Sequence, residues 1–346
     1  MKRTLAALLI LPLVAAAAPS KTAWATVSGY AGSTTLANFP VLVKISESAV
    51  PGFHYADCAA GGADLSFRDA AGNALPFDVD TWDESGTSLV WVLLPEVAPG
   101  GATAFKIGWA DPNPPAANAA SVWTGSGHKG VWHMNSVSPA DASGSGNDGT
   151  AQGSPAVSAS GRIGKALSLP TTSDYVSCGS NQSNAELKDA FTVEAWVNPD
   201  SYSGKRAFFG KNEFISIKTD GQSAIWVTTP GKTDHKFTNL SLPAVNTWWH
   251  IAITFQMNES EGCKLYVNGA SLKQQDASTI VNQTGSTEMW LGKNQWGENY
   301  TGLLDEMRLA AAIRSADWIA ADYAQVARDD FVEFGAAGPA SMVFFY

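Results

Sequence analysis

The chain has 346 residues and a formal net charge of −10, with 45% hydrophobic and only 16% charged residues. This composition is too apolar and aromatic for a disordered chain, and three cysteines are too few for a disulfide scaffold. An acidic chain of low charge density lacks the basic surface that nucleic acids and anionic membranes attract, which excludes those partners. The length is typical of two domains.

Residues 1–18 have the pattern of a secretory signal peptide. Lys2 and Arg3 precede an apolar run from Leu5 to Val14, and four alanines follow. The run is short for a membrane span, although an uncleaved anchor is the alternative. No later segment suits a bilayer, so we expect a protein without a membrane span after cleavage, either secreted, periplasmic or at the cell surface.

Export would place Cys58, Cys178 and Cys263 in a compartment that permits disulfides. Their odd number leaves at least one thiol without an intrachain partner. Cys178 and Cys263 lie in the same predicted domain, where they either pair or remain small buried thiols, and we favour the second interpretation.

Short strand patterns fill the first half, at residues 40–45, 64–68, 75–82, 89–94 and 105–109. In the third of these, Phe77 and Val79 alternate with Asp78 and Asp80. Turn residues separate the strands, and no helical period occurs. The pattern predicts a small antiparallel β-sandwich over residues 22–110.

The acidic run of Asp78, Asp80, Asp83 and Glu84 is reminiscent of a cation-binding loop. An EF-hand needs glycine at its sixth position and glutamate at its twelfth, and counting from Asp78 these positions hold Asp83 and Leu89. We therefore interpret the run as a solvated strand face that enters a turn.

Residues 111–127 are predicted to be a linker. Pro112, Pro114 and Pro115 disfavour regular structure, and the alanines and glycines that follow lack an apolar period. The prolines stiffen such a segment. We expect the two halves to fold independently of each other.

Longer strands follow the linker, at residues 191–198, 214–218, 249–255, 263–267, 288–291 and 302–309, with a last strand at 331–334. Asn268-Gly269 indicates a hairpin turn. Ser315 is a helix N-cap, with Asp317 in the first turn and apolar residues at helical spacing behind it. The pattern predicts an all-β jelly-roll sandwich with one short C-terminal helix, followed by a tail over residues 337–346.

Seven segments of the second half resemble the laminin-G-like, concanavalin-A-like lectin and glucanase group, over residues 128–336. These segments are 130–134, 141–150, 164–169, 191–199, 248–252, 265–269 and 302–308. In the first half, residues 38–43, 64–68, 75–77 and 90–92 resemble a small uncharacterised β-domain of bacterial envelope proteins.

The group so implied contains both enzymes and binding modules. Its glucanases place paired carboxylates on one strand, so that both face the substrate. Here strand 191–198 offers only Glu194, while Glu259 and Glu261 lie in a polar hairpin segment. Nucleophile-elbow, zinc-helix and phosphate-loop motifs are absent from the sequence. We therefore expect no catalytic site.

The resemblance also implies a structural calcium ion, held by an aspartate of the last long strand. Asp305 matches that position, and the oxygen-rich loop with Asp141 and Asp148 would supply further ligands. The alternative is that Asp305 only accepts backbone hydrogen bonds.

Most tryptophans on alternating strands are expected to pack inside, namely Trp91, Trp109, Trp196, Trp226, Trp249 and Trp290. Trp296 lies instead in the loop 292–300, and loops at sandwich ends carry ligand contacts. Asn294, Trp296 and Tyr300 are therefore the candidate ligand residues. The alternative is a loop tryptophan folded onto the sandwich.

These observations favour a non-catalytic recognition or adhesion protein, whose partner is a glycan or a surface protein. Two alternatives remain. One is a glycan hydrolase or lyase with an unrecognised site, and the other is a structural stalk domain of a larger envelope protein.

Overall fold

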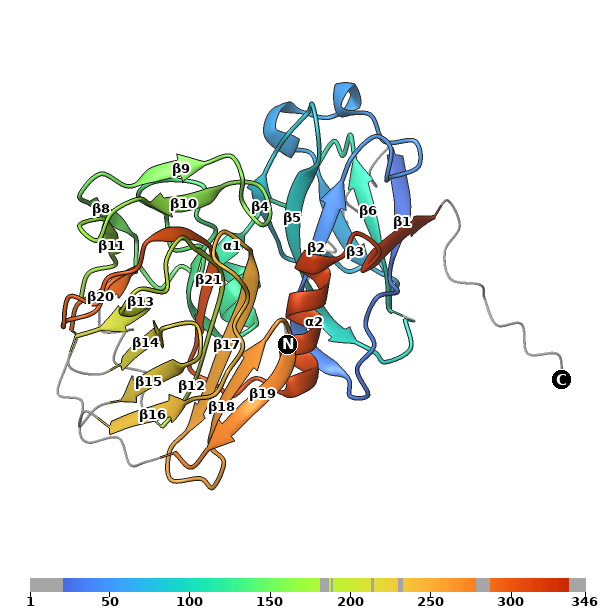
Figure 1. Ribbon diagram of the computed structural model, residues 1–346. Coiled ribbons are helices and arrows are strands. Elements are labelled where there is room, and N and C mark those ends of the chain that lie inside the picture. The colour runs from blue at the N-terminus through green and yellow to red at the C-terminus, as the bar shows by residue number, and fades with distance from the viewer. Residues whose placement is uncertain are drawn as a thin grey trace, which may run out of the picture.

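The computed structural model shows two antiparallel β-sandwiches with a helix between them (Figure 1). The described residues are 21–101, 103–180, 187, 189–212, 215–229, 233–277 and 287–335. The predicted signal peptide and the tail 337–346 lie outside them. The all-β fold class is confirmed, including the short C-terminal helix.

The first sandwich packs a four-stranded sheet, in the order β22-β1-β6-β3, against a three-stranded sheet in the order β2-β5-β4. Its strands are β1 (Lys21–Val27), β2 (Leu36–Ile45), β3 (Ser66–Asp69), β4 (Phe77–Thr81), β5 (Ser88–Val97), β6 (Thr103–Trp109) and β22 (Val332–Gly335). Two 3-10 turns, Tyr55–Asp57 and Ala60–Gly62, precede β3. Phe39, Phe67 and Phe105 are among the residues that fill the core.

Strand β22 joins the two ends of the described chain. It pairs with β1, with Val332 opposite Val27, and the Phe331 carbonyl accepts hydrogen bonds from the Ser28 and Gly29 amides at 3.1 Å. The expected final strand therefore exists, but it completes the first sandwich and not the second. The sequence could not indicate that the last strand pairs with the first sandwich, because local periodicity contains no information on which sheet a strand joins.

The second sandwich consists of an eight-stranded and a seven-stranded sheet. In the first, the order is β19-β18-β17-β12-β21-β10-β9, and β7 also pairs with β21. Its strands are β7 (His128–Trp132), β9 (Ala156–Ser158), β10 (Ala166–Leu169), β12 (Ala190–Pro199), β17 (Trp249–Gln256), β18 (Cys263–Val267), β19 (Ala270–Gln275) and β21 (Gly302–Ala310).

The seven-stranded sheet has the order β16-β15-β14-β13-β20-β11-β8. Its strands are β8 (Thr150–Gln152), β11 (Tyr175–Ser177), β13 (Lys205–Lys211), β14 (Ile215–Asp220), β15 (Ile225–Thr229), β16 (Thr233–Phe237) and β20 (Met289–Leu291). The core between the two sheets includes Cys178 and Cys263. Both are free, buried thiols, and Cys58 is also free.

A short helix, α1 (Ala119–Gly125), lies inside the predicted linker. The Asn118 side chain caps it by accepting a hydrogen bond from the Ser121 amide, and Val122 and Trp123 are buried. The expectation of irregular structure is therefore wrong for residues 119–125. So short a helix is marginal by itself, and burial of its two apolar residues stabilises it in a way that periodicity does not show.

Helix α2 (Ala316–Ala327) lies between the sandwiches (Figure 1). Ser315 caps it as expected, because its side chain accepts a hydrogen bond from the Trp318 amide. The Trp318 ring contacts Phe39 of the first sandwich at 4.8 Å between centroids, while Tyr323 stacks on Trp196 of the second at 5.4 Å. The helix therefore packs on both sandwiches.

A shared apolar cluster continues this contact. Trp91 from β5, Trp123 from α1 and Trp196 from β12 belong to one buried cluster, together with Val131 and Val326. Because these residues come from both sandwiches and both helices, the two halves of the chain bury part of their apolar surface against each other. This shared core replaces the expectation that the two halves fold independently.

We expect Trp123→Ala to lower the free energy of unfolding by about 3–5 kcal/mol, the usual cost of a large aromatic deletion from a core. Calorimetry of the full chain should show one transition, shifted as a whole, because the cluster belongs to both halves. Leu272→Ala is the control, since this side chain is 45% exposed. Two transitions, of which only one moves, would contradict the shared core.

Candidate functional site

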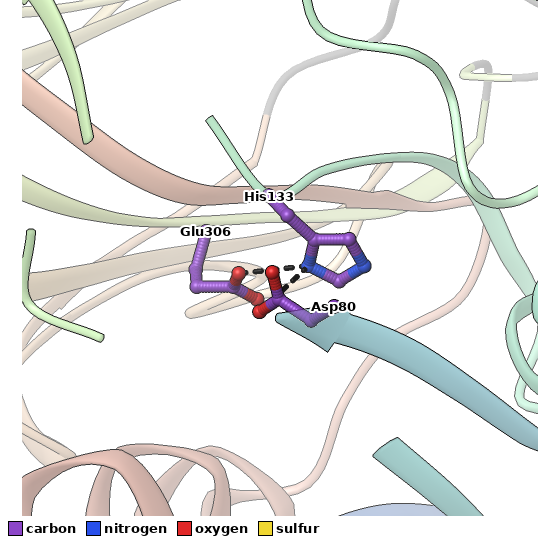
Figure 2. Close-up of side chains that lie close together, drawn as sticks. All are labelled: Asp80, His133 and Glu306. Carbon is purple, nitrogen blue, oxygen red and sulfur yellow. Dashed lines mark hydrogen bonds and ion pairs between the residues drawn. The ribbon is translucent and has the colours of Figure 1, made fainter. Parts of the chain in front are cut away.

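A buried ionic cluster lies where the first sandwich meets the second. Figure 2 shows three of its side chains, Asp80 on β4, His133 directly after β7, and Glu306 on β21. His133 Nδ1 lies 2.8 Å from Glu306 Oε1 and 3.7 Å from Asp80 Oδ2. Its other nitrogen, Nε2, lies 3.0 Å from Asp78 Oδ2. The imidazole ring therefore bridges carboxylates of both sandwiches.

The electrostatics of the cluster favour a protonated imidazole. Burial by itself lowers the pKa of His133, but Glu306 and the two aspartates outweigh it and hold this pKa well above its ordinary value. Burial also disfavours the Glu306 anion, yet His133 and Arg308 pull the pKa of Glu306 below its usual range. For Asp80, burial dominates and raises the pKa to about 7. The net result is an imidazolium held between carboxylates.

The sequence suggested that Asp78 and Asp80 lie on a solvated strand face. The structure shows that this interpretation is wrong, because both side chains contact His133. Asp78 Oδ2 also accepts a hydrogen bond from Trp123 Nε1 at 2.8 Å. The alternation with Phe77 and Val79 is real, but the polar face of β4 packs against the second sandwich. Sequence alternation separates two faces of a strand without indicating which protein surface covers them.

A second titratable cluster lies between α2 and the eight-stranded sheet. It contains Glu194 on β12, His250 on β17 and Asp322 on α2. Arg308 connects it to the first cluster, because its Nη1 lies 2.5 Å from Asp322 Oδ1 and its Nη2 lies 2.6 Å from Glu306 Oε2. Burial lowers the pKa of His250 to about 4, while burial and Asp322 raise the pKa of Glu194 to about 8.

Glu194 is the carboxylate on which an enzyme interpretation would depend. Its residue is only 3% exposed, on the face of the sheet that α2 covers. A polysaccharide therefore does not reach this carboxylate in the structure described.

The outer face of the seven-stranded sheet has a different chemistry. We call Lys205, Lys218, Trp226, Lys236 and Trp296 the aromatic–lysine face. Lys236 Nζ and Lys205 Nζ lie 4.0 and 4.1 Å from the centroid of Trp226, and Lys218 Nζ lies 4.6 Å from that of Trp296. Trp296 is 43% exposed, although tryptophan side chains are highly buried on average.

Glu298 organises this face from below. Its Oε2 accepts a bond from Lys218 Nζ at 2.5 Å and another from Asn294 Nδ2 at 2.8 Å, and its Oε1 lies 3.5 Å from Lys205 Nζ. Burial would raise the pKa of Glu298, but its bonds with Lys218 and Asn294 lower it below the ordinary value. The carboxylate thus holds two lysines beside the tryptophan rings.

The three predicted ligand residues have different environments. Asn294 and Tyr300 are each 1% exposed, so neither side chain is available to a ligand at the surface. Asn294 Oδ1 accepts the Trp296 and Glu298 amides and shapes the loop, and the Tyr300 hydroxyl donates to the Leu303 carbonyl. Only Trp296 is exposed as expected.

We expected Trp226 to pack inside the sandwich. The structure places it on the outer face of the seven-stranded sheet. Ile225 and Val227 on either side of it belong to the core, so Trp226 must point the other way. The alternation of β15 contained this signal, because consecutive strand residues face opposite sides.

The predicted calcium ligands accept backbone hydrogen bonds. Asp305 Oδ2 accepts the Arg162 and Ile163 amides at 2.8 and 3.1 Å, and Asp148 Oδ1 accepts the Asp141 amide at 2.8 Å. Among the described residues, Asp305, Asp141 and Asp148 do not form a group of three with ligand atoms within 4.8 Å. The contacts of Asp305 match the alternative, in which it accepts backbone hydrogen bonds, and calcium binding stays a prediction.

Residues 170–320 match the family model described as the concanavalin A-like lectin/glucanases superfamily. This segment covers much of the second sandwich, so the resemblance to the concanavalin-A-like group is confirmed over these residues. No curated protein matches the chain. In the part of the chain that the structure describes, no helix has the length and hydrophobicity needed to cross a membrane.

Several solved structures are similar to the chain. Domain 4 of AbnA, a GH43 extracellular arabinanase from Geobacillus stearothermophilus in complex with arabinotriose, is 20% identical with a TM-score of 0.48, over 57% of this chain and 98% of that chain. The binding domain of Paraclostridial Mosquitocidal Protein 1 is 16% identical with a TM-score of 0.45, over 57% of this chain and 52% of that chain.

The binding domain of botulinum neurotoxin DC in complex with SialylT is 12% identical with a TM-score of 0.46, over 58% of this chain and 52% of that chain. This chain thus covers about half the length of each of the two toxin structures. Likenesses at these identities and TM-scores do not indicate what this chain binds.

The ionic cluster predicts how stability depends on pH. The pKa values of Asp80 and His133 are both raised in the folded state, so the folded protein binds protons that the unfolded chain releases. The free energy of unfolding should therefore fall as pH rises, first through Asp80 up to about pH 7 and then, above about 6.5, through His133.

Denaturant titrations at several pH values check this. Relative to wild type, Asp80→Asn should flatten the slope below about pH 7, and His133→Gln should flatten it above about pH 6.5. Asp69→Asn is a control carboxylate, because its pKa is shifted downward and not upward. A slope that neither cluster variant changes would show that the cluster does not titrate as proposed.

Proposed function

We propose that this protein is an exported, non-catalytic recognition protein that binds carbohydrate on the aromatic–lysine face. The observation that carries the proposal is the position of Trp296. Its ring is 43% exposed, and Lys218 Nζ lies between it and Trp226, at 4.6 and 5.8 Å from the two centroids. Exposed apolar surface with polar groups around it is a feature of ligand-binding sites.

The chemistry of this face suits a sugar. The apolar faces of a pyranose ring pack on flat aromatic rings, and its hydroxyls need donors and acceptors close to that plate. Lys205 and Lys236 supply ammonium donors, because their side chains are 32% and 47% exposed, and Glu298 supplies carboxylate acceptors beside Lys205. The loop is also held in shape by Asn294, so that little conformational entropy is lost on binding.

The charge of the face favours an acidic sugar. Three lysines and two carboxylates, those of Glu298 and Asp234, gather around two tryptophans, so the face is net positive in a chain that has 22 basic and 32 acidic residues. Such a local excess of ammonium groups attracts carboxylates in an otherwise acidic protein. We therefore propose polyuronate chains as the ligand class. Export rests on the signal-peptide pattern of residues 1–18, and the superfamily of residues 170–320, which includes lectins, supports recognition.

We expect Trp296→Ala to raise the Kd for an oligogalacturonate about tenfold, equivalent to about 1.4 kcal/mol. The free energy of unfolding should change by no more than about 0.5 kcal/mol, because the ring is largely exposed. Titration calorimetry and a denaturation curve measure the two quantities.

Trp24→Ala is the matched control for this experiment. Trp24 lies on β1 of the first sandwich, and Lys106 Nζ is 4.6 Å from its ring, the same distance that separates Lys218 from Trp296. Its removal should leave binding unchanged. Equal loss of affinity in both variants would contradict the site. If the wild type binds neither acidic nor neutral glycans, the interpretation as a structural stalk domain is favoured instead.

A further inference from the structure

Two groups of metal-ligating side chains of the same composition lie among the described residues. Each has one histidine and two carboxylates with ligand atoms within 4.8 Å, and each lies between a sheet of the second sandwich and its neighbours. The first is Asp80, His133 and Glu306, and the second is Glu194, His250 and Asp322. Their contacts differ in a way that separates an ion-pair network from a cation site.

In the first group, both nitrogens of the histidine have hydrogen-bond partners within the cluster. Both nitrogens of His133 make short contacts with carboxylate oxygens, at 2.8 Å to Glu306 and 3.0 Å to Asp78. These are charge-assisted hydrogen bonds of ordinary length. Nothing in this group requires a further ligand.

The second group leaves polar atoms without partners. His250 Nε2 lies 3.7 Å from Glu194 Oε2 and 4.0 Å from Asp322 Oδ2, which is too far for hydrogen bonds. Among the residues that the structure describes, Glu194 Oε2, the oxygen that faces His250, has no hydrogen-bond partner. Glu194 and His250 are only 3% and 1% exposed, so water does not compensate from the surface. Buried groups in this state are costly.

The spacing of the same atoms suits a metal ion. Ligand atoms about 2.0–2.2 Å from a tetrahedral zinc-like ion are roughly 3.3–3.6 Å from one another. The separations of 3.7 and 4.0 Å here are slightly longer, so small side-chain shifts would bring the ligand atoms to an ion. Asp322 is also oriented for this role, because its Oδ1 accepts bonds from Arg308 at 2.5 Å and from Gln325 Nε2 at 2.9 Å. Its Oδ2 is left facing His250, as in carboxylates held by an outer shell of hydrogen bonds.

We propose that Glu194, His250 and Asp322 bind a divalent transition-metal ion such as zinc. The imidazole nitrogen selects this class of cation over calcium, which prefers oxygen ligands. The ion would connect β12 and β17 of the eight-stranded sheet to α2, the helix that also packs on the first sandwich. The site is separate from the aromatic–lysine face and does not depend on the proposed glycan function.

The test uses the full chain, unfolded with a chelator and refolded with Zn²⁺, because the buried site is open only in the unfolded chain. After desalting, elemental analysis should find about one zinc per folded chain. Refolding with Ca²⁺ should leave no calcium whose retention depends on Glu194. Zinc should also raise the melting temperature by several degrees relative to chelator.

Glu194→Gln should abolish zinc retention and the shift of the melting temperature. Glu306→Gln is the matched control, because it removes a buried carboxylate that also contacts Arg308 but belongs to the first group. It should retain zinc. Less than about 0.1 zinc in wild type, or equal zinc in Glu194→Gln, would overturn the proposal.

A second readout covers the case in which Glu194→Gln does not fold. Asp322→Asn then replaces it. If neither variant folds, wild type refolded with Co²⁺ decides. Strong visible absorption from a cobalt ion of low coordination number supports the site, and the weak spectrum of hydrated cobalt overturns it.

Discussion

The imidazolium of His133 is the interaction on which the arrangement of this protein depends. It lies between Glu306 of the second sandwich and Asp78 of the first, at 2.8 and 3.0 Å. Burying such a charge is expensive, and its attraction to carboxylates offsets the cost only when the geometry is good. An orientation that separates Asp78 from His133 would lose the bond between the two sandwiches. The ion pair therefore selects one domain arrangement, while apolar contacts around Trp123 and α2 supply most of the stabilisation.

This arrangement also decides which surface is free for function. The outer face of the eight-stranded sheet is covered by α2 and by the first sandwich, where Glu194 and Trp196 are buried. The seven-stranded sheet lies on the opposite side of the core, and its outer face carries Trp226 and the loop with Trp296. One sheet is therefore used for assembly of the fold, and the other is available for the recognition that we propose.

Much of the fold follows from local sequence. Alternation located most strands, and Ser315 marked the start of α2 correctly. The failures share one physical cause, which is burial by distant segments. Asp78 has the pattern of a solvated residue, but its partner lies 55 residues away. Tyr300 has the polar loop context of a ligand residue, but its ring packs in the core. Trp226 was the exception, because the pattern of its own strand already placed it outside.

A double-mutant cycle between Asp78 and His133 tests the central claim most directly. Each residue is replaced by alanine, singly and together, and the free energy of unfolding of the full chain is measured at pH 6. The account predicts a coupling energy of about 1–3 kcal/mol, because the two side chains form a buried, charge-assisted hydrogen bond across the domain interface. Additive effects, within about 0.5 kcal/mol, would contradict the claim that this ion pair joins the two sandwiches.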